Sequence, residues 1–437
     1  MRKLLVALVV VALGLVPTTA RASGPEAADR PNILLINTDD QRADTLDVMP
    51  KLRRWFADGR TFTRSLVNIP SCCPSRATLF SGDYPHNHGV RHQVDAKNLD
   101  VDATLPGYLS RAGYRTAMAG KYLNSWPLEQ APPHFDRFSS IHGGYQPFNV
   151  LDSELSPNRK MHVKEYSTTW LGGRLESFIE SFQREKSEKT DRPWFAYYAP
   201  VAPHRPWQPE AKYADYPVRE CLEPDELDRS DKPRYIQRHR YEPDEFRRIC
   251  ENSLRALMSV DDAVDSLLRR IDSLGALDNT LVIYTSDNGY LWGAHGRDSK
   301  FAPYLQAMRV PLLMRWPGRI PRGEDSRLVT TVDVLPTVLD AAGESVPPQA
   351  KGLSLLKEQA HETVFSEYFY DDHNGGIPDW AASFDGRRHY IETYADSGEI
   401  AFVELYDTEV DPGEDENIAT EDNVQRLHEQ LLQWRRS

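Results

Sequence analysis

Residues 71–82 read Ser-Cys-Cys-Pro-Ser-Arg-Ala-Thr-Leu-Phe-Ser-Gly, a stretch in which Cys72 is followed by x-Pro-Ser-Arg. Pro74 suits the first turn of a helix, because its ring presets φ and its missing N–H would have no partner there, and Gly82 suits the end of the helix. Cys72 would then lie at a helix N-terminus, where free amides favour an anion. This spacing points to a chemically modified nucleophile, and the alternative is a buried cysteine pair beside an ordinary helix.

The segments on either side of this stretch alternate between apolar, β-branched runs and helical patterns. A helix-like stretch ends at Gly59, and an apolar stripe with helical spacing runs from Leu254 to Leu274. The alternation predicts an α/β fold with a large mixed, mostly parallel sheet sandwiched by helices. The expected strands of this sheet are residues 32–37, 115–120, 194–198 and 281–285.

The C-terminal part has a different character. Strand-like pieces at residues 363–368, 388–393 and 402–406 precede a helical pattern at 421–435, so we expect a small antiparallel sheet closed by a terminal helix. We therefore predict a large α/β domain at residues 23–355 and an α+β subdomain at residues 356–437. The charged, Pro-rich segment 208–248 lacks periodicity, and we interpret it as a surface excursion that is either a substrate wall or a tolerated insertion.

The N-terminus reads as a secretory leader. Arg2 and Lys3 precede an apolar run at residues 4–16, and Ala20-Arg21-Ala22 offers a small-x-small cleavage site, so residues 1–22 are predicted to be a signal peptide. The apolar run is too short to span a bilayer comfortably, and we expect a secreted protein, extracellular or periplasmic, without a membrane anchor. The formal net charge of −13 disfavours nucleic-acid binding and requires a local cationic pocket for any anionic substrate.

Cysteine use fits an exported protein. Cys221 and Cys250 flank the charged excursion, and a disulfide between them is the expected use in an oxidising compartment, although spacing alone does not establish that they are close. Cys73 is expected to stay a buried thiol.

Two pairs of oxygen-bearing side chains follow expected strands. Asp39 and Asp40 come directly after the first strand, and Asp287 and Asn288 follow the strand at residues 281–285. The carboxyl ends of strands are where open α/β sheets place ligands, whereas the simpler interpretation of an Asp pair is a surface turn. An all-oxygen donor set with three carboxylates suits Ca²⁺ or Mg²⁺ rather than Zn²⁺.

Cationic candidates occur at matching places. Arg76 lies one helical turn after Cys72 and would share its face of the helix. Lys121 ends the strand at residues 115–120, and His204 follows the strand at 194–198. Each is weak evidence taken singly, because a lone Lys is usually a solvated charge. Jointly they would form a site of the kind that an oxyanion needs.

The stretch around Cys72 resembles the signature of the sulfatase family, in which the first cysteine is oxidised to a formylglycine by a dedicated enzyme. The resemblance covers residues 31–435 and implies an alkaline-phosphatase-like fold and a catalytic role for the large domain. It also implies Ca²⁺ bound by the following residues: Asp39, Asp40, Cys72, Asp287 and Asn288. The implied catalytic residues are Cys72, Arg76, Lys121, His204 and Lys300. In this scheme the hydrated aldehyde attacks sulfur with Asp287 as base, and His204 protonates the leaving oxygen.

One position departs from the pattern of many sulfatases. They carry a histidine two residues after the first active-site lysine, whereas this chain has Leu123 there, followed by Asn124. The segment Gly120–Asn124 instead resembles the N-acetylglucosamine-6-sulfatase branch. Three histidines remain as candidates for the missing base: His86, His88 and His295.

The resemblance predicts a sulfuric ester hydrolase that acts on a carbohydrate sulfate, namely 6-O-sulfated N-acetylglucosamine or a sulfated polysaccharide. The expected partners are this substrate and a formylglycine-generating enzyme during maturation. Two alternatives stay open. One is a phosphodiester or phosphonate monoester hydrolase on the same scaffold, and the other is a non-catalytic, cation-dependent glycan-binding protein with an unmodified Cys72.

Overall fold

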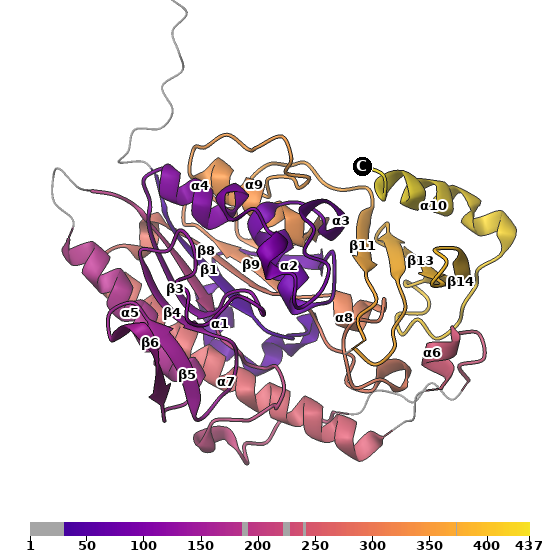
Figure 1. The fold of residues 1–437 in the computed structure, drawn as a ribbon, viewed down its shortest axis with the longest axis horizontal. Helices are drawn as coiled ribbons and strands as arrows, with labels where there is room; N and C mark the ends of the chain where they lie inside the picture. Colours follow the sequence, from indigo (N-terminus) through magenta and orange to yellow (C-terminus); the bar gives the residue numbers. More distant parts are fainter. Residues whose placement is uncertain (1–29, 186–190, 222–227, 239–241, 373) are drawn as a thin grey trace, which may run out of the picture.

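The computed structural model describes residues 30–185, 191–221, 228–238, 242–372 and 374–437, so the predicted leader at residues 1–22 lies outside the described residues. A ten-stranded sheet in the order β10-β2-β9-β8-β1-β7-β3-β4-β5-β6 forms the centre of the molecule (Figure 1). Its strands are β1 (Asn32–Thr38), β2 (Arg60–Leu66), β3 (Arg115–Lys121), β4 (Arg137–Ile141), β5 (Phe148–Asp152), β6 (Ser156–Val163), β7 (Trp194–Ala199), β8 (Thr280–Ser286), β9 (Leu312–Arg315) and β10 (Gly323–Thr330).

The central strands β8, β1, β7, β3 and β4 run parallel to one another. They include the four strands that the sequence predicts, and β1, β7 and β8 are buried along their whole length, as continuous apolar runs require. Antiparallel pairs join β2 to β9, β9 to β8, β4 to β5 and β5 to β6. The predicted mixed, mostly parallel sheet is therefore confirmed, and all carboxyl ends of the parallel centre lie at one edge.

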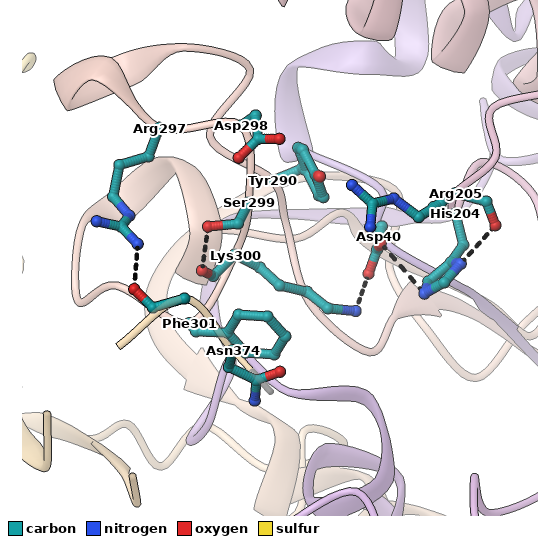
Figure 2. Close-up of a pocket in the computed structure, with 11 residues that line it drawn as sticks. Asp40, His204, Arg205, Tyr290, Arg297, Asp298, Ser299, Lys300, Phe301 and Asn374 are labelled. Carbon is teal, nitrogen blue, oxygen red and sulfur yellow. Dashed lines mark hydrogen bonds and ion pairs between the residues drawn. The ribbon is translucent and has the colours of Figure 1, made fainter. Parts of the chain in front are cut away.

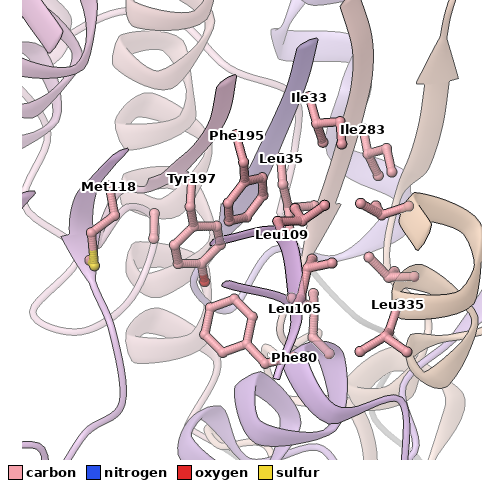
Figure 3. Packing of buried hydrophobic residues seen from close by; sticks show 14 of the residues in the cluster. Ile33, Leu35, Phe80, Leu105, Leu109, Met118, Phe195, Tyr197, Ile283 and Leu335 are labelled. Carbon is pink, nitrogen blue, oxygen red and sulfur yellow. The ribbon is translucent and has the colours of Figure 1, made fainter. Parts of the chain in front are cut away.

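Helices cover both faces of the sheet (Figure 1). Alternate residues of β1 face opposite ways, so Ile33 and Leu35 pack in one apolar cluster and Leu34 and Ile36 in the other. Figure 3 shows the first cluster, in which sheet residues meet side chains from the helices on that face. The helices of this face are α2 (Cys72–Ser81), α4 (Leu105–Arg111) and α9 (Val334–Ala341), and those of the other face include α1 (Pro50–Trp55), α5 (Ser167–Arg184) and α7 (Pro243–Ser273).

Two helix boundaries differ from the prediction. The helix expected to end at Gly59 is divided into a short turn at Ala43–Val48 and α1, because Pro50 starts a new helix at its first position. Helix α7 begins at Pro243, inside the segment interpreted as an irregular excursion. Its first turn carries Asp244 and Glu245, which favour a helix N-terminus but add to the charged composition that hid the helix.

The C-terminal sheet has four antiparallel strands, one more than predicted: β11 (Val364–Tyr368), β12 (Trp380–Phe384), β13 (Arg388–Tyr394) and β14 (Ile400–Asp407). The unpredicted strand β12 is short and contains small residues that give little β signal. The predicted terminal helix is α10 (Glu421–Trp434), whose Leu427, Leu431 and Trp434 pack against this sheet. A domain boundary at residue 355 stays a prediction. Among the described residues, no helix has the length and apolar character needed to cross a bilayer.

Gly120 allows β3 to approach β7 beside the predicted site. Its φ is +125°, and a Cβ there would lie 1.9 Å from the carbonyl oxygen of Ala199. We expect Gly120→Ala to lower the free energy of unfolding by about 3 kcal/mol, because backbone strain and overpacking add. Urea unfolding followed by circular dichroism measures the change.

The matched control is Gly173→Ala in α5, where a Cβ meets nothing within 4 Å. That variant should gain about 0.5–1 kcal/mol from the lower entropy of its unfolded chain. Equal stability of the two variants would contradict the role assigned to Gly120.

Candidate active site

The two acidic pairs meet at the carboxyl ends of the neighbouring strands β1 and β8. The amide of Asp40 donates to Asp287 Oδ1 at 3.2 Å, and Asn288 Nδ2 donates to Asp40 Oδ1 at 2.7 Å. Asp39, Asp287 and Asn288 have no exposed surface, and Asp40 is 3% exposed. These residues are therefore a buried cluster and not the surface turn that an Asp pair alone would favour.

Helix α2 brings Cys72 onto this cluster. Its Sγ lies 3.1 Å from Asp39 Oδ1 and 3.9 Å from Asp40 Oδ1. The helix starts at Cys72 and ends at Gly82, which has a φ of 66° and donates its amide to Thr78, as the sequence predicts. Gln93 fixes the first turn, since it accepts from the amide of Cys73 at 3.1 Å and donates to Ser71 Oγ at 2.9 Å.

Three buried cations balance the three carboxylates. Arg76 Nε donates to Asp287 Oδ2 at 2.8 Å, and Lys121 Nζ donates to Asp39 Oδ2 at 2.6 Å. Lys300 Nζ donates to Asp40 Oδ1 and lies 2.6 Å from Cys72 Sγ. Each of these cations is at most 4% exposed.

The pKa values of the carboxylates Asp39 and Asp287 shift in opposite directions. Burial raises the pKa of Asp39, but Lys121, His204 and Arg76 act against it, and the net result is a pKa well below the usual range. The pKa of Asp287 is raised, by burial first and by the negative charge of Asp39 second. Burial followed by the charge of Asp287 also raises the pKa of the Cys72 thiol. An unmodified Cys72 is thus a poor thiolate nucleophile in this environment.

The cluster fits a hard divalent cation. Asp39, Asp40 and Cys72 offer ligand atoms that, together with a nitrogen of His204, lie within 4.8 Å of one another. Asn288 Oδ1 is buried and has no hydrogen-bond partner among the residues that the structure describes, so it has a lone pair to offer. The donors are mainly carboxylate and amide oxygens, which suit Ca²⁺ or Mg²⁺. The residues present therefore fit the metal that the resemblance implies.

A cavity of about 330 Å³ opens above Lys300 and Asp40 (Figure 2). His204 lies at its side, with Nε2 3.8 Å from Asp40 Oδ2 and Nδ1 2.8 Å from the carbonyl of Arg205. Tyr145 donates its hydroxyl to the carbonyl of His204 at 2.6 Å and so fixes this loop. The cavity is lined by Asp40, His204, Arg205, Tyr290, Arg297, Asp298, Ser299, Lys300, Phe301, Asn374 and Gly375.

All sequence-predicted site residues come together, but several lining residues were missed. The missed polar ones are Arg205, Tyr290, Arg297, Asp298, Ser299 and Asn374. Five of them are within five residues of a predicted site residue in the sequence, so proximity was an available signal for them. Asn374 comes from the C-terminal part, and no pattern in the sequence connects it with Cys72.

The three histidines proposed to replace the missing base do not line the cavity. His86 in α3 (Pro85–His88) contacts Glu367 at 2.8 Å and packs on Trp434. His88 contacts Thr78 Oγ1 at 3.0 Å, and burial followed by the charge of His86 lowers its pKa to about 3. His295 stacks on Tyr304 with ring centroids 3.6 Å apart. Each ring thus has contacts outside the cavity.

The cysteine predictions are confirmed. Cys221 and Cys250 form a disulfide, and Cys73 is a buried free thiol in the apolar cluster under α2. The disulfide connects the described start of the charged excursion to the first part of α7.

A buried carboxylate cluster with matching cations, at the strand ends of such a sheet, is suited to hold a metal ion and an oxyanion. Residues 31–344 match the family model of the sulfatases, and residues 293–436 match the model described as N-sulphoglucosamine sulphohydrolase, C-terminal. The first match covers more than half of the chain. The chain therefore belongs to the sulfatase family.

Two relatives illustrate the similarity. An extracellular sulfatase SULF-1 homolog of Drosophila melanogaster is 30% identical over 356 residues, 77% of this chain and 32% of that protein. The N-acetylglucosamine-6-sulfatase of Homo sapiens is 32% identical over 357 residues, 75% of this chain and 64% of that protein. The matched part of the chain thus corresponds to less than two thirds of each relative.

Solved structures share the fold. The structure of BT4656 in complex with its substrate D-glucosamine-2-N,6-O-disulfate has a TM-score of 0.79 at 23% identity and covers 93% of this chain and 97% of that chain. The phosphonate monoester hydrolase of Silicibacter pomeroyi has a TM-score of 0.75 at 20% identity and covers 93% of this chain and 95% of that chain. At these identities the similarity shows the fold alone.

The lowered pKa of His88 predicts a pH-dependent stability. An unfolded His88 binds a proton near pH 6.5, whereas the folded one binds it only near pH 3. The contribution of the neutral His88 ring to the free energy of unfolding is therefore fully present above pH 6.5. It falls by about 1.4 kcal/mol per pH unit as the pH drops toward 3. His88→Asn should flatten this slope, as measured by urea unfolding between pH 4 and 7.

The control is His162→Asn on β6, because the ring of His162 is exposed. It should leave the slope unchanged. The same slope in both variants would contradict the burial effect at His88.

Proposed function

We propose that the chain is a secreted sulfuric ester hydrolase that removes sulfate from a carbohydrate, namely 6-O-sulfated N-acetylglucosamine or a polysaccharide that contains it. The observation that carries the proposal is the position of Cys72, at a helix N-terminus in contact with Asp39 and Lys300. A cysteine kept only for packing does not need a surrounding of buried, paired charges, which are costly to bury. Membership of the sulfatase family and the N-acetylglucosamine-6-sulfatase relative support the choice of reaction and substrate.

Asp39, Asp40, Asp287 and Asn288 would hold Ca²⁺, with Mg²⁺ as the alternative, and Cys72 completes this set. The bound cation would offset negative charge on the sulfuryl oxygens. Conversion of Cys72 to formylglycine by a maturation enzyme would supply a hydrated aldehyde as the nucleophile. The thiol itself, with its raised pKa, does not offer one.

The remaining residues bind and orient the ester. Lys121 and Lys300 present ammonium groups beside Cys72, and their raised pKa values keep them charged at neutral pH. For both lysines burial lowers the pKa, but the charge of the neighbouring carboxylate helps to raise it, and the net result is a raised pKa. Arg76 contacts Asp287 and Asp39 and thereby keeps the helix N-terminus against the strand ends. His204 faces the cavity and is the group placed to protonate the leaving oxygen.

Hydrolysis of a phosphonate or phosphodiester is the second candidate. The similar fold of the phosphonate monoester hydrolase of Silicibacter pomeroyi favours it. Phosphate and sulfate share a tetrahedral oxyanion and differ mainly in charge. A direct comparison of the two esters therefore discriminates between the candidates.

The function is tested by the turnover of a sulfate ester and a phosphate ester of one chromogenic alcohol, together with sulfate release from 6-O-sulfated N-acetylglucosamine. We expect kcat/KM for the sulfate ester to exceed that for the phosphate ester at least ~10-fold, because a site complementary to the transition state of one ester binds that of the other, with its different charge, less well. A chelator should abolish both activities, and added Ca²⁺ or Mg²⁺ should restore them. A preference for the phosphate ester would reject the proposal.

Cys72→Ala tests the assigned nucleophile. This variant should lose at least ~10³-fold in kcat while it keeps the fold, because the attacking group is removed. Cys73→Ala is the matched control, since its thiol lies in the apolar cluster, and it should keep substantial activity. Mass spectrometry of the peptide around Cys72 should show formylglycine in the secreted protein.

Equal losses in the two variants would mean that the modified position is wrong. An intact thiol at Cys72 in every molecule, together with carbohydrate binding but no turnover, would favour a non-catalytic glycan-binding protein.

A further inference from the structure

The charges deep in the site are paired, whereas the outer cavity carries a cation, Arg205, without a carboxylate partner among the described residues. Lys300 is paired with Asp40, and Lys121 and Arg76 are paired with Asp39 and Asp287. We assign these three cations to the reacting sulfate, and Lys300 is the one of them that lines the cavity. Two further guanidinium groups nevertheless line the wall, those of Arg205 and Arg297.

Arg297 is part of the wall. It is 3% exposed, and it donates to the carbonyls of Tyr235 at 3.1 Å and Gly375 at 3.5 Å. Figure 2 shows Asp298 between Arg297 and Tyr290, so a carboxylate lies on the same side of the cavity. Arg297 therefore joins two loops, and its charge is partly offset by Asp298.

Arg205 differs from Arg297 in exposure and in partners. Its side chain is exposed, and within the part of the chain that the structure describes it has no carboxylate partner and makes no side-chain hydrogen bond. Figure 2 shows it on the other side of Tyr290 from Asp298, beside His204 and above Asp40. Its charge is thus available to a ligand next to the group assigned as proton donor.

A rigid aromatic surface positions Arg205 without neutralising it. Its guanidinium carbon lies 5.2 Å from the ring centroid of Trp207, which is 5% exposed. Trp207 packs in an apolar cluster with the disulfide of Cys221 and Cys250 and with Tyr290. A side chain held in this way loses less entropy when it binds an anion.

We propose that Arg205 binds a second anionic group of the substrate, so that the enzyme selects glycans in which the scissile sulfate has a sulfo or carboxylate group nearby. This inference rests on the proposed function and names the substrate class more closely. A sugar with one sulfate would use the paired inner charges and leave Arg205 without a partner. A guanidinium offers two parallel donors to a sulfate or carboxylate, which an ammonium does not. The acidic chain repels anionic glycans in general, so local cations decide which of them bind.

The test compares three substrates: 6-O-sulfated N-acetylglucosamine, D-glucosamine-2-N,6-O-disulfate, and a disaccharide of 6-O-sulfated N-acetylglucosamine with a uronic acid. The quantity measured is the ratio of kcat/KM for each doubly anionic substrate to that for the first. For the wild-type protein we expect this ratio to be at least ~10 for one of the two doubly anionic substrates. The substrate with the higher ratio identifies the group that Arg205 binds, a sulfo group for the disulfate or a carboxylate for the disaccharide. Arg205→Ala should lower this ratio ~10- to 100-fold, and Arg205→Lys should lower it less.

Arg248→Ala is the matched control, because Arg248 lies 5.9 Å from the same Trp207 ring but does not line the cavity. It should keep the wild-type ratio. Equal losses of Arg205→Ala on all three substrates, or an unchanged ratio in both arms, would overturn the inference while the proposed function stands. Absence of turnover of every sulfate ester by the wild-type protein would instead reject the proposed function.

Discussion

The stability of this fold depends on the mutual neutralisation of three carboxylates and three cations. All six groups are buried near the carboxyl ends of the central strands. Asp39, Asp40 and Asp287 pair with Lys121, Lys300 and Arg76, respectively. Removal of one member of such a cluster leaves an uncompensated buried charge, which costs about 3–5 kcal/mol. The same requirement keeps the helix that carries Cys72 against β1 and β8, so the stability of the domain and the geometry of the site depend on one set of contacts.

The sheet topology explains why residues so distant in sequence meet. β1 lies between β7 and β8, and β3 is the next strand beyond β7, so four successive carboxyl ends supply Asp39, Asp287, Lys121 and the loop of His204. Loops that follow these ends form the cavity, and the C-terminal part adds Asn374 to its wall. The rigid strands position the inner charges, while the longer loops determine the shape of the outer cavity.

The sequence predicted the parallel centre and the inner site because both depend on local patterns. Asp39 and Asp287 directly follow apolar runs, and Cys72 has a distinctive neighbourhood. Other features depend on tertiary contacts that leave little local signal. Strand β12 is short, helix α7 starts in a charged segment, and Asn374 reaches the cavity through the packing of a second sheet. The histidines that were candidates for the missing base, such as His88, make contacts elsewhere and do not line the cavity.

The cross-link between Cys221 and Cys250 lies behind the outer wall of the cavity and not behind the charge cluster. The inner ion pairs form without it, whereas the platform beneath Arg205 includes it. The disulfide therefore bears on the support of Arg205 more than on the inner ion pairs. In a chain produced in a reducing cytosol, we expect the inner ion pairs to form, while Trp207 beneath Arg205 is held by packing alone. The same polypeptide would then discriminate less among its ligands than one produced in an oxidising compartment, which makes the choice of expression host part of any measurement of its selectivity.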